Sequence, residues 1–249
     1  MSYNASSGTP LVKVLVEARL GSRRKMAEAI KQGLVTLNGQ KAESYSQPVN
    51  TQQDKVTFEG KPVELSRIRR IYLMLNKPPE IVSTTSDELG RKTVMDLLHR
   101  RYEGAGLFPV GRLDEATTGL LLLTNDGELT NRLTHPSYEI EKEYLISIDA
   151  ALTQADKESL EKGMLLDDGL TSPARLSRVT DEPPYNYKLI IHEGKKRIVR
   201  RMFAHLGYQI KALKRSRIAT LRLGKLEEGK TRELTPGEIA ALKRITRLK

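Results

Sequence analysis

The chain has 249 residues, 38% of them hydrophobic, and no cysteine, which is typical of a globular protein and excludes disulfides, thiolate nucleophiles and zinc–thiolate sites. No apolar run approaches the roughly 20 residues that span a bilayer, and residues 1–10 lack the features of a secretory signal, so we expect a cytoplasmic protein without membrane contact. The formal net charge of +11 is concentrated in two basic blocks, residues 1–70 and 195–217, a distribution typical of proteins that bind a nucleic-acid backbone.

The first 70 residues predict a small module. Apolar residues recur at helical spacing over 11–18, and Ser22 is placed to cap a second helix over 23–32. Strands are expected over 34–38, which runs into an Asn-Gly turn, and over 55–58.

The order helix, Ser-Arg-Arg, helix and Gly-x-Val-x-x-Asn-Gly resembles the S4 RNA-binding domain. We expect this domain over 11–65, between a flexible N-terminus over 1–10 and a basic linker over 66–70. The first turn of its second helix carries three cations that can grip phosphates together with the helix amides: Arg23, Arg24 and Lys25. The alternative is a solvated basic helix end.

From Ile71 onward the pattern predicts a larger α+β domain over 71–249. Its strands and helices alternate without a regular β-α-β rhythm, which favours a mixed, mainly antiparallel sheet. Strands are expected over 71–77, 120–123, 144–148 and 187–192. Helices are expected over 92–101, 126–133, 153–162 and 199–206, and a last one begins at Pro236 after the cap Thr235.

One carboxylate, Asp114, precedes the four leucines of 120–123, which read as a short strand buried on both faces. A carboxylate on a loop held by a buried strand has the rigid support that a catalytic group needs. From spacing alone, the equally good alternative is an ion pair of Arg112 with Asp114 that braces the loop.

The stretch Gly-Arg-Leu-Asp-x-x-Thr-x-Gly-Leu from Gly111 is similar to the catalytic loop of the pseudouridine synthases, in the form of the bacterial ribosomal RNA enzymes of the RsuA/RluB type. Segments that agree in order and spacing lie at 75–78, 135–144, 191–203 and 234–236. The resemblance spans about residues 11–245. It implies a monomeric enzyme that isomerises a uridine of ribosomal RNA, or of a ribosomal assembly intermediate, without metal, nucleotide or other cofactor.

The resemblance implies that Asp114 is the catalytic carboxylate and that Arg200 pairs with its charge, with Arg112 as the local alternative. A fixed cation would offset the rise in pKa that burial causes in a carboxyl group. Tyr144 matches the active-site tyrosine, which lies on the face of the uracil. Leu189 or Ile191 would form the floor of the uracil pocket. The uridine has to leave its helix or be unpaired to reach such a site.

Phosphates flanking the uridine are expected to contact a set of basic residues, for which the alternative is a solvated strand and turn: Arg132, Arg201, Lys211, Lys214, Arg215 and Arg217. One departure from the family pattern is Ile198, which replaces a polar residue ahead of the paired arginines. Substrate positioning is the property that this replacement affects.

Other functions fit the chain less well. The acidic pairs Asp167-Asp168 and Asp181-Glu182 lie in turn contexts and predict solvated loops rather than a metal site. The histidines lack a metal-binding spacing, and no phosphate-binding glycine loop is present. We therefore predict a 23S rRNA pseudouridine synthase. The alternatives are the same activity on 16S rRNA and a non-catalytic rRNA-binding or ribosome-assembly factor.

Overall fold

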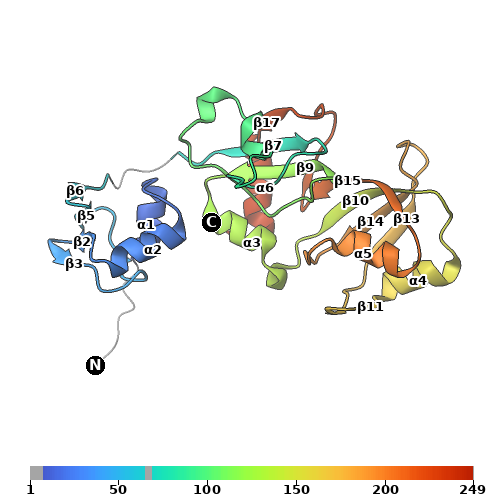
Figure 1. The fold of residues 1–249 in the computed structure, drawn as a ribbon, viewed down its shortest axis with the longest axis horizontal. Helices are drawn as coiled ribbons and strands as arrows, with labels where there is room; N and C mark the ends of the chain where they lie inside the picture. Colours follow the sequence, from blue (N-terminus) through green and yellow to red (C-terminus); the bar gives the residue numbers. More distant parts are fainter. Residues whose placement is uncertain (1–7, 65–68, 249) are drawn as a thin grey trace. The chain divides into compact units, whose positions relative to one another are not determined.

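A computed structural model describes residues 8–64 and 69–248 of the chain (Figure 1). They belong to two units, Met1–Arg70 and Ile71–Lys249. Most of the predicted flexible start and of the predicted linker, residues 1–7 and 66–68, lies outside the described residues. No helix of the described part is long and apolar enough to cross a membrane.

The first unit packs two helices on a small sheet. Helices α1 (Leu11–Glu17) and α2 (Arg23–Lys31) are buried against a sheet of order β3-β2-β5-β6. The sheet strands are β2 (Val35–Leu37), β3 (Gln40–Lys41), β5 (Val56–Phe58) and β6 (Lys61–Pro62). The core is apolar, as the predicted helical spacing requires, and includes Leu11, Leu15, Met26, Ile30, Val35 and Val56.

The chain enters this unit through a short strand rather than a flexible segment. Strand β1 (Thr9–Pro10) pairs antiparallel with β4 (Pro48–Val49). The pairing continues into α1, because the N–H of Leu11 donates to the carbonyl of Gln47 at 2.8 Å. The prediction of flexibility over 1–10 was therefore wrong at Thr9 and Pro10, whose backbone is held by partners about 40 residues away in the chain.

The second unit is built on a nine-stranded sheet. Its main path is β13-β14-β10-β15-β9-β7-β17, with β8 on β9 and β16 on β15. All pairs are antiparallel except β15 with β9, so the predicted mixed, mainly antiparallel α+β class is confirmed. The strands are β7 (Tyr72–Lys77), β8 (Phe108–Pro109), β9 (Thr118–Thr124), β10 (Lys142–Ile148), β13 (Arg175–Arg178), β14 (Tyr187–Ile191), β15 (Ile210–Ile218), β16 (Leu221–Arg222) and β17 (Thr231–Glu233).

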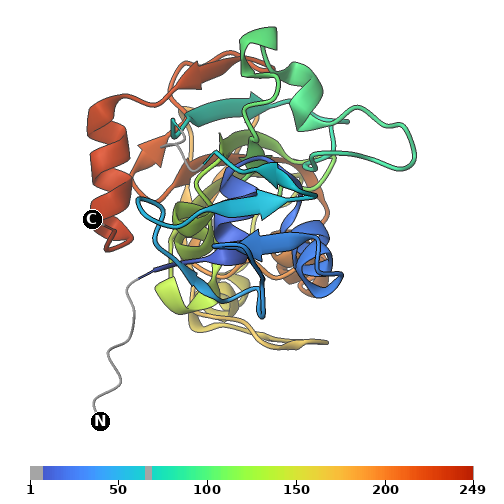
Figure 2. The ribbon, with the colours of Figure 1, turned by 90° about the vertical axis from the view of Figure 1, so that its left-hand side faces the viewer.

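Helices cover both faces of this sheet. On one face α3 (Gly127–Thr134) and α6 (Pro236–Ile245) pack on the central strands through Leu129, Leu133 and Leu242. On the other face lie α4 (Gln154–Lys162) and α5 (Ile198–His205). Figure 2 shows red β17 beside teal β7 at one edge of the sheet.

Strand β9 lies between the two cores. Leu120 and Leu122 belong to the core beneath α3 and α6, and Leu121 and Leu123 belong to the core on the opposite face. All four side chains are 0% exposed, which confirms the predicted strand with two buried faces. A strand that is apolar on both sides fits only in the middle of a covered sheet.

One predicted helix is replaced by two short turns. Residues 92–101 form the 3₁₀ helices η1 (Val94–Leu97) and η2 (Arg100–Tyr102). Between them Leu98 is extended, with ψ of 144°, and the side chain of His99 accepts from the N–H of Arg101 at 3.1 Å. The helical pattern is interrupted because His99 caps a new turn.

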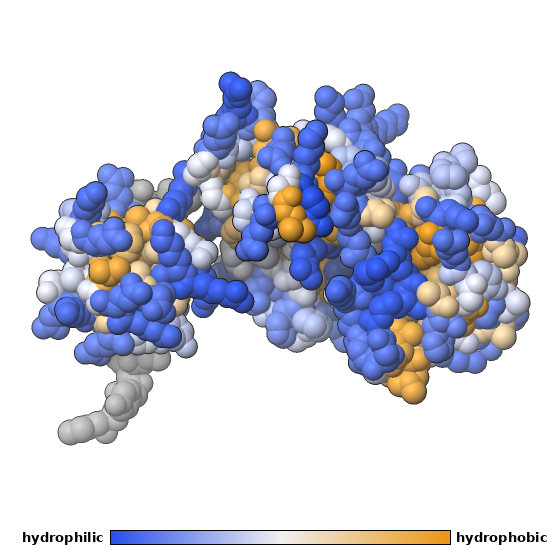
Figure 3. Space-filling view, viewed as in Figure 1, coloured by the Kyte–Doolittle hydropathy of each residue, from blue (hydrophilic) through white to orange (hydrophobic). Residues whose placement is uncertain are grey.

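An apolar patch lies on a hairpin of the second unit. The hairpin joins β11 (Leu165–Leu166) to β12 (Gly169–Leu170), and it lies at the lower end of the second unit in Figure 3. Its paired residues Leu165 and Leu170 are 70% and 67% exposed.

Gly119 is expected to be the least replaceable glycine of the sheet. It has φ of +100°, and a Cβ there would lie 2.3 Å from the carbonyl oxygen of Arg215. Gly119→Ala should lower the free energy of unfolding by about 2–4 kcal/mol, measured by urea denaturation. The matched control is Gly127→Ala at the start of α3, where a Cβ meets nothing within 4 Å. Equal stabilities of the two variants would contradict this account of the β9–β15 contact.

Lys77, at the end of β7, should make stability depend on pH. Its side chain is 0% exposed, and burial lowers its pKa to about 8. Between pH 8 and 10 the unfolded chain keeps a proton that the folded chain has released, so the free energy of unfolding should rise with pH over this range. Lys142 on β10, whose pKa is also about 8, adds to the rise. Lys77→Met should remove about 2–3 kcal/mol of it in urea titrations at several pH values. An unchanged pH slope would show that Lys77 is not buried as a cation.

Candidate active site

A cleft of about 870 Å³ opens in the second unit. Its walls come from the loop 110–117 before β9, the loop 82–91, β10, β15 and the start of α5. The three residues predicted to carry catalysis all line it, although they come from separate parts of the chain: Asp114, Tyr144 and Arg200.

The loop that carries Asp114 is fixed through its main chain. Ser83, which is buried, donates to the carbonyl of Leu113 at 2.9 Å and accepts from the N–H of the same residue at 3.2 Å. The carbonyl of Glu115 accepts from Nζ of Lys77 and from the N–H of Glu80, both at 3.1 Å. Both neighbours of Asp114 are thus held, which orients its half-buried side chain without using the carboxylate.

The predicted ion pair of Asp114 with Arg200 is not formed in the described part of the chain. Arg200 donates instead to the carbonyls of Ala116 at 3.3 Å and Ile210 at 3.5 Å. Burial lowers the pKa of the guanidinium, and the nearby charge of Asp114 acts in the opposite direction. Arg200 therefore binds the loop beside Asp114, and its charge interacts with the carboxylate without a direct ion pair.

The alternative with Arg112 is not formed either. Arg112 is exposed and makes no ion pair among the described residues, so it does not brace the loop through Asp114. Its position in the cleft wall leaves the side chain accessible to a bound molecule. The Asp114 carboxylate consequently has no hydrogen-bond or ion-pair partner within the described residues.

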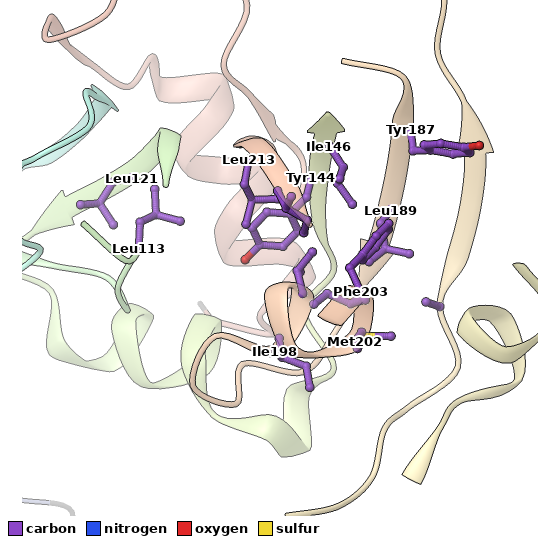
Figure 4. Close-up of a cluster of buried hydrophobic side chains, with 14 of the residues drawn as sticks. Leu113, Leu121, Tyr144, Ile146, Tyr187, Leu189, Ile198, Met202, Phe203 and Leu213 are labelled. Atoms are coloured by element: carbon purple, nitrogen blue, oxygen red, sulfur yellow. The ribbon is translucent and has the colours of Figure 1, made fainter. Parts of the chain in front are cut away.

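Tyr144 lies on β10, one of the strands that line the cleft. On β10 it lies opposite Leu189 of β14 and Arg215 of β15, and it is 9% exposed. Figure 4 shows its ring beside Leu213, with the hydroxyl directed away from Leu189 and toward the side where Leu113 lies. This hydroxyl makes no hydrogen bond among the described residues, so it can contact a substrate.

The predicted floor of the pocket is assigned to other residues. Leu189 and Ile191 are fully buried in the core and do not line the cleft. The apolar side chains that do line the cleft include Leu213 and Ile198, the residue that departs from the family pattern. Ile198 begins α5 and is 5% exposed, because it packs into the same core as Tyr144.

Most of the basic residues predicted to grip RNA in this unit already have partners. Arg132 donates to the carbonyls of Thr246 and Arg247, and Arg201 pairs with the adjacent acids Asp167 and Asp168. The turn context had predicted a solvated loop at 167–168. Both acids of this turn instead pair with Arg201.

The predicted basic strand behaves in the same way. Arg217 bonds Glu141, Glu143 and the carbonyl of Ala219. Lys211 pairs with Asp149, and Lys214 lies over the ring of Tyr185. Sequence reasoning could not find these partners, because strand register decides which acid meets which base.

Two cations at the cleft were missed by sequence reasoning, and a third is more buried than the alternative of a solvated strand allows. The third is Arg215, predicted to contact a flanking phosphate, which is 3% exposed and lines the cleft. Lys142 lines it too, and Lys77 lies beneath the Asp114 loop. The sequence gives no signal that Lys77, directly before Pro78, is buried or that Lys142, directly before Glu143, is half-buried. Among the described residues, no group of three or more acids, histidines or cysteines could hold a metal.

The first unit presents its cations openly. The side chain of Ser22 accepts from the N–H of Lys25 at 3.2 Å, which confirms the predicted cap of α2. Arg23, Arg24 and Lys25 are exposed and have no ion-pair partner in the described part of the unit. They remain available to an anion.

Two family models match the chain. Residues 71–205 match the RNA pseudouridylate synthase family, and residues 9–56 match the S4 domain. Ribosomal large subunit pseudouridine synthase B of Bacillus subtilis is 40% identical over 94% of this chain and 96% of its own. An uncharacterized RNA pseudouridine synthase of Aquifex aeolicus is 40% identical over 95% and 94% of the two chains.

A solved structure shares the fold as well. The crystal structure of a pseudouridylate synthase superposes with a TM-score of 0.67 at 34% identity, covering 94% of this chain and 99% of its own. The family match spans more than half of the chain, and it includes Asp114, Tyr144 and Arg200. The chain therefore belongs to the RNA pseudouridine synthases and is an enzyme of that family with an N-terminal S4 domain.

Proposed function

We propose that the enzyme converts a specific uridine of 23S ribosomal RNA into pseudouridine, with Asp114 as its catalytic carboxylate. The observation that carries the proposal is the Asp114 carboxylate, which has no partner within the described residues and lies on a loop held by main-chain bonds, in a cleft that also contains Tyr144 and Arg200. The large-subunit target is supported by the names of two relatives, the enzyme of Bacillus subtilis and one of Pseudomonas aeruginosa that is 39% identical and of which the chain spans 64%.

The reaction breaks the bond from ribose C1′ to uracil N1 and forms a bond from C1′ to C5, while C5 loses its proton and N1 gains one. Asp114 either adds to uracil C6 or attacks or deprotonates the ribose, and both routes need the carboxylate form. Lys77 and Arg200 lie near enough to attract its charge. Both cations are fixed before substrate arrives, so the charge is stabilised without reorganisation.

The uridine is proposed to enter the cleft flipped out of the RNA, because its reacting atoms are hidden in a helix. Tyr144 would lie on the face of the uracil, and its free hydroxyl would reach a proton-transfer position. Arg112, exposed beside Asp114, would contact the RNA from which the uridine has left. In this arrangement Ile198 and Leu213 exclude water from the uracil edge.

Asp114→Asn should abolish pseudouridine formation while keeping RNA affinity within a few-fold. The rate should fall by more than about 10³-fold, because the amide can neither attack nor accept the proton. Pseudouridine mapping of 16S and 23S rRNA incubated with each protein gives the product and the target together. The neighbouring Glu115→Gln is the control and should stay active, since it keeps the main chain that holds the loop and removes only an exposed ion pair with Arg91 at 3.5 Å. An active Asp114→Asn enzyme would refute the mechanism. Product in 16S rRNA alone would refute the target.

The S4 unit is proposed to hold the RNA by its phosphates. Replacing Arg23, Arg24 and Lys25 together by Gln should weaken binding of 23S rRNA. It should also flatten the dependence of log affinity on log salt by about 0.7–0.9 for each phosphate that the variant no longer neutralises. The control is Lys31→Gln at the other end of α2, which is exposed in the same way. A triple variant with an unchanged salt slope would show that this helix end does not touch phosphate.

A further inference from the structure

Lys142 and Arg215 line the cleft, and neither has an acidic partner in the described part of the chain. Arg215 on β15 is 3% exposed, and its Nε donates to the carbonyl of Leu120 at 2.8 Å. Its Nη2 is buried and has no hydrogen-bond partner among the described residues. Within the same residues, Lys142 on β10 donates only to main-chain carbonyls, those of Ile140 at 3.2 Å and His192 at 3.1 Å.

The nearby acids are committed elsewhere. Glu193, which acts on Lys142 electrostatically, accepts from the N–H of Ser172 at 2.8 Å and pairs with Lys195 at 3.6 Å. Glu143, next to Lys142 in sequence, contacts Ser216 and Arg217. The charges of Lys142 and Arg215 repel each other, so their proximity costs stability unless an anion joins them.

Fold stability alone does not require this pair. The bond from Nε of Arg215 to the carbonyl of Leu120 links β15 to β9. A side chain with a single donor could make this link, whereas the guanidinium leaves a second buried nitrogen unsatisfied among the described residues. Buried orphan donors are rare in folded proteins and mark a missing partner. The missing partner must be a hydrogen-bond acceptor. Because Lys142 and Arg215 are both positively charged, they favour an acceptor that is an anion.

The position of the pair identifies the anion. Tyr144 lies directly opposite Arg215 in the sheet, and Lys142 is two residues before Tyr144 on the same strand. A nucleotide whose uracil lies at Tyr144 carries a phosphate on each side of its ribose, within one nucleotide length of the base. A guanidinium fork matches phosphate oxygens with two parallel hydrogen bonds.

We propose that Lys142 and Arg215 form a phosphate subsite inside the cleft, which binds one of the two phosphodiesters that flank the target uridine. This inference rests on the proposed function for the identity of the substrate. The subsite pulls the backbone of the flipped nucleotide into the cleft. The exposed cations of the first unit would bind phosphates at the surface. The subsite lies inside the cleft and would bind a single phosphate that has left the solvent.

The test uses an RNA fragment around the uridine that pseudouridine mapping identifies, in three forms. One has natural phosphates, and the others carry a neutral methylphosphonate on the 5′ or the 3′ side of that uridine. Single-turnover kcat/KM is measured for the wild type, Lys142→Met, Arg215→Lys and the control Lys188→Gln, a cation of β14 outside this cleft. Wild type should lose about 10–100-fold on one of the two methylphosphonates.

On natural RNA, kcat/KM of Lys142→Met should be lower than that of the wild type by a similar factor. Changing the RNA to that methylphosphonate should lower kcat/KM of this variant by less than about threefold more, since both changes remove the same contact. Lys188→Gln should behave as wild type. The subsite would be overturned if the losses in kcat/KM from the substitution and from the methylphosphonate multiplied in Lys142→Met, or if this variant showed no loss on natural RNA. Lys142→Met removes a buried charge and should fold even if Arg215→Lys does not.

A second measurement does not depend on activity. Titration of the wild type with inorganic phosphate, followed by the ¹³Cε signal of Lys142 in ¹³C-lysine-labelled protein, should show a saturable shift that Arg215→Lys weakens. No shift would overturn the subsite. If the wild type makes no pseudouridine in either rRNA, the proposed function fails, and this titration still decides whether the anion site exists.

Discussion

The parallel contact between β9 and β15 sets the geometry of the cleft. It brings Gly119, at the end of the catalytic loop, against the backbone of Arg215, so closely that no side chain fits between them. The loop with Asp114 and the strand facing Tyr144 are thereby fixed relative to each other. Because β9 is buried on both faces, neither core can shift without moving this contact.

The electrostatics of the cleft follow from the same arrangement. Lys77, Lys142, Arg200 and Arg215 are all partly or fully removed from water, and they bind main-chain carbonyls instead of carboxylates. Carbonyl dipoles orient a cation without neutralising it. The cleft consequently holds a positive charge that is fixed in direction and available to a polyanion, while Asp114 supplies a carboxylate without a partner among the described residues.

Local signals made much of the fold predictable. The caps Ser22, Thr153 and Thr235 bind the N–H groups of their own helices, so a few adjacent residues suffice to place those helix starts. The leucine run of β9 was equally clear. Asp114, Tyr144 and Arg200 were found through motif spacing, and the structure places them in one cleft.

Other features depend on pairing across the sheet and were not predictable in the same way. Whether Arg215 faces the interior while Arg217 meets Glu141 and Glu143 depends on the register of β15 against β10, which contains bulges. The predicted helix over 92–101 failed because His99 starts a new turn. Burial of Lys77 follows from a loop that folds back over it 38 residues later.

The way in which the catalytic loop is anchored separates chemistry from target choice. Ser83 and Lys77 hold only backbone atoms of Leu113 and Glu115, whereas the side chains of Arg112, Glu115 and Ala116 are exposed around the cleft mouth. Substitutions at those exposed positions leave the carboxylate where it is. Descendants of such an enzyme can therefore acquire new RNA partners through a handful of surface exchanges, with no need to rebuild the reactive centre.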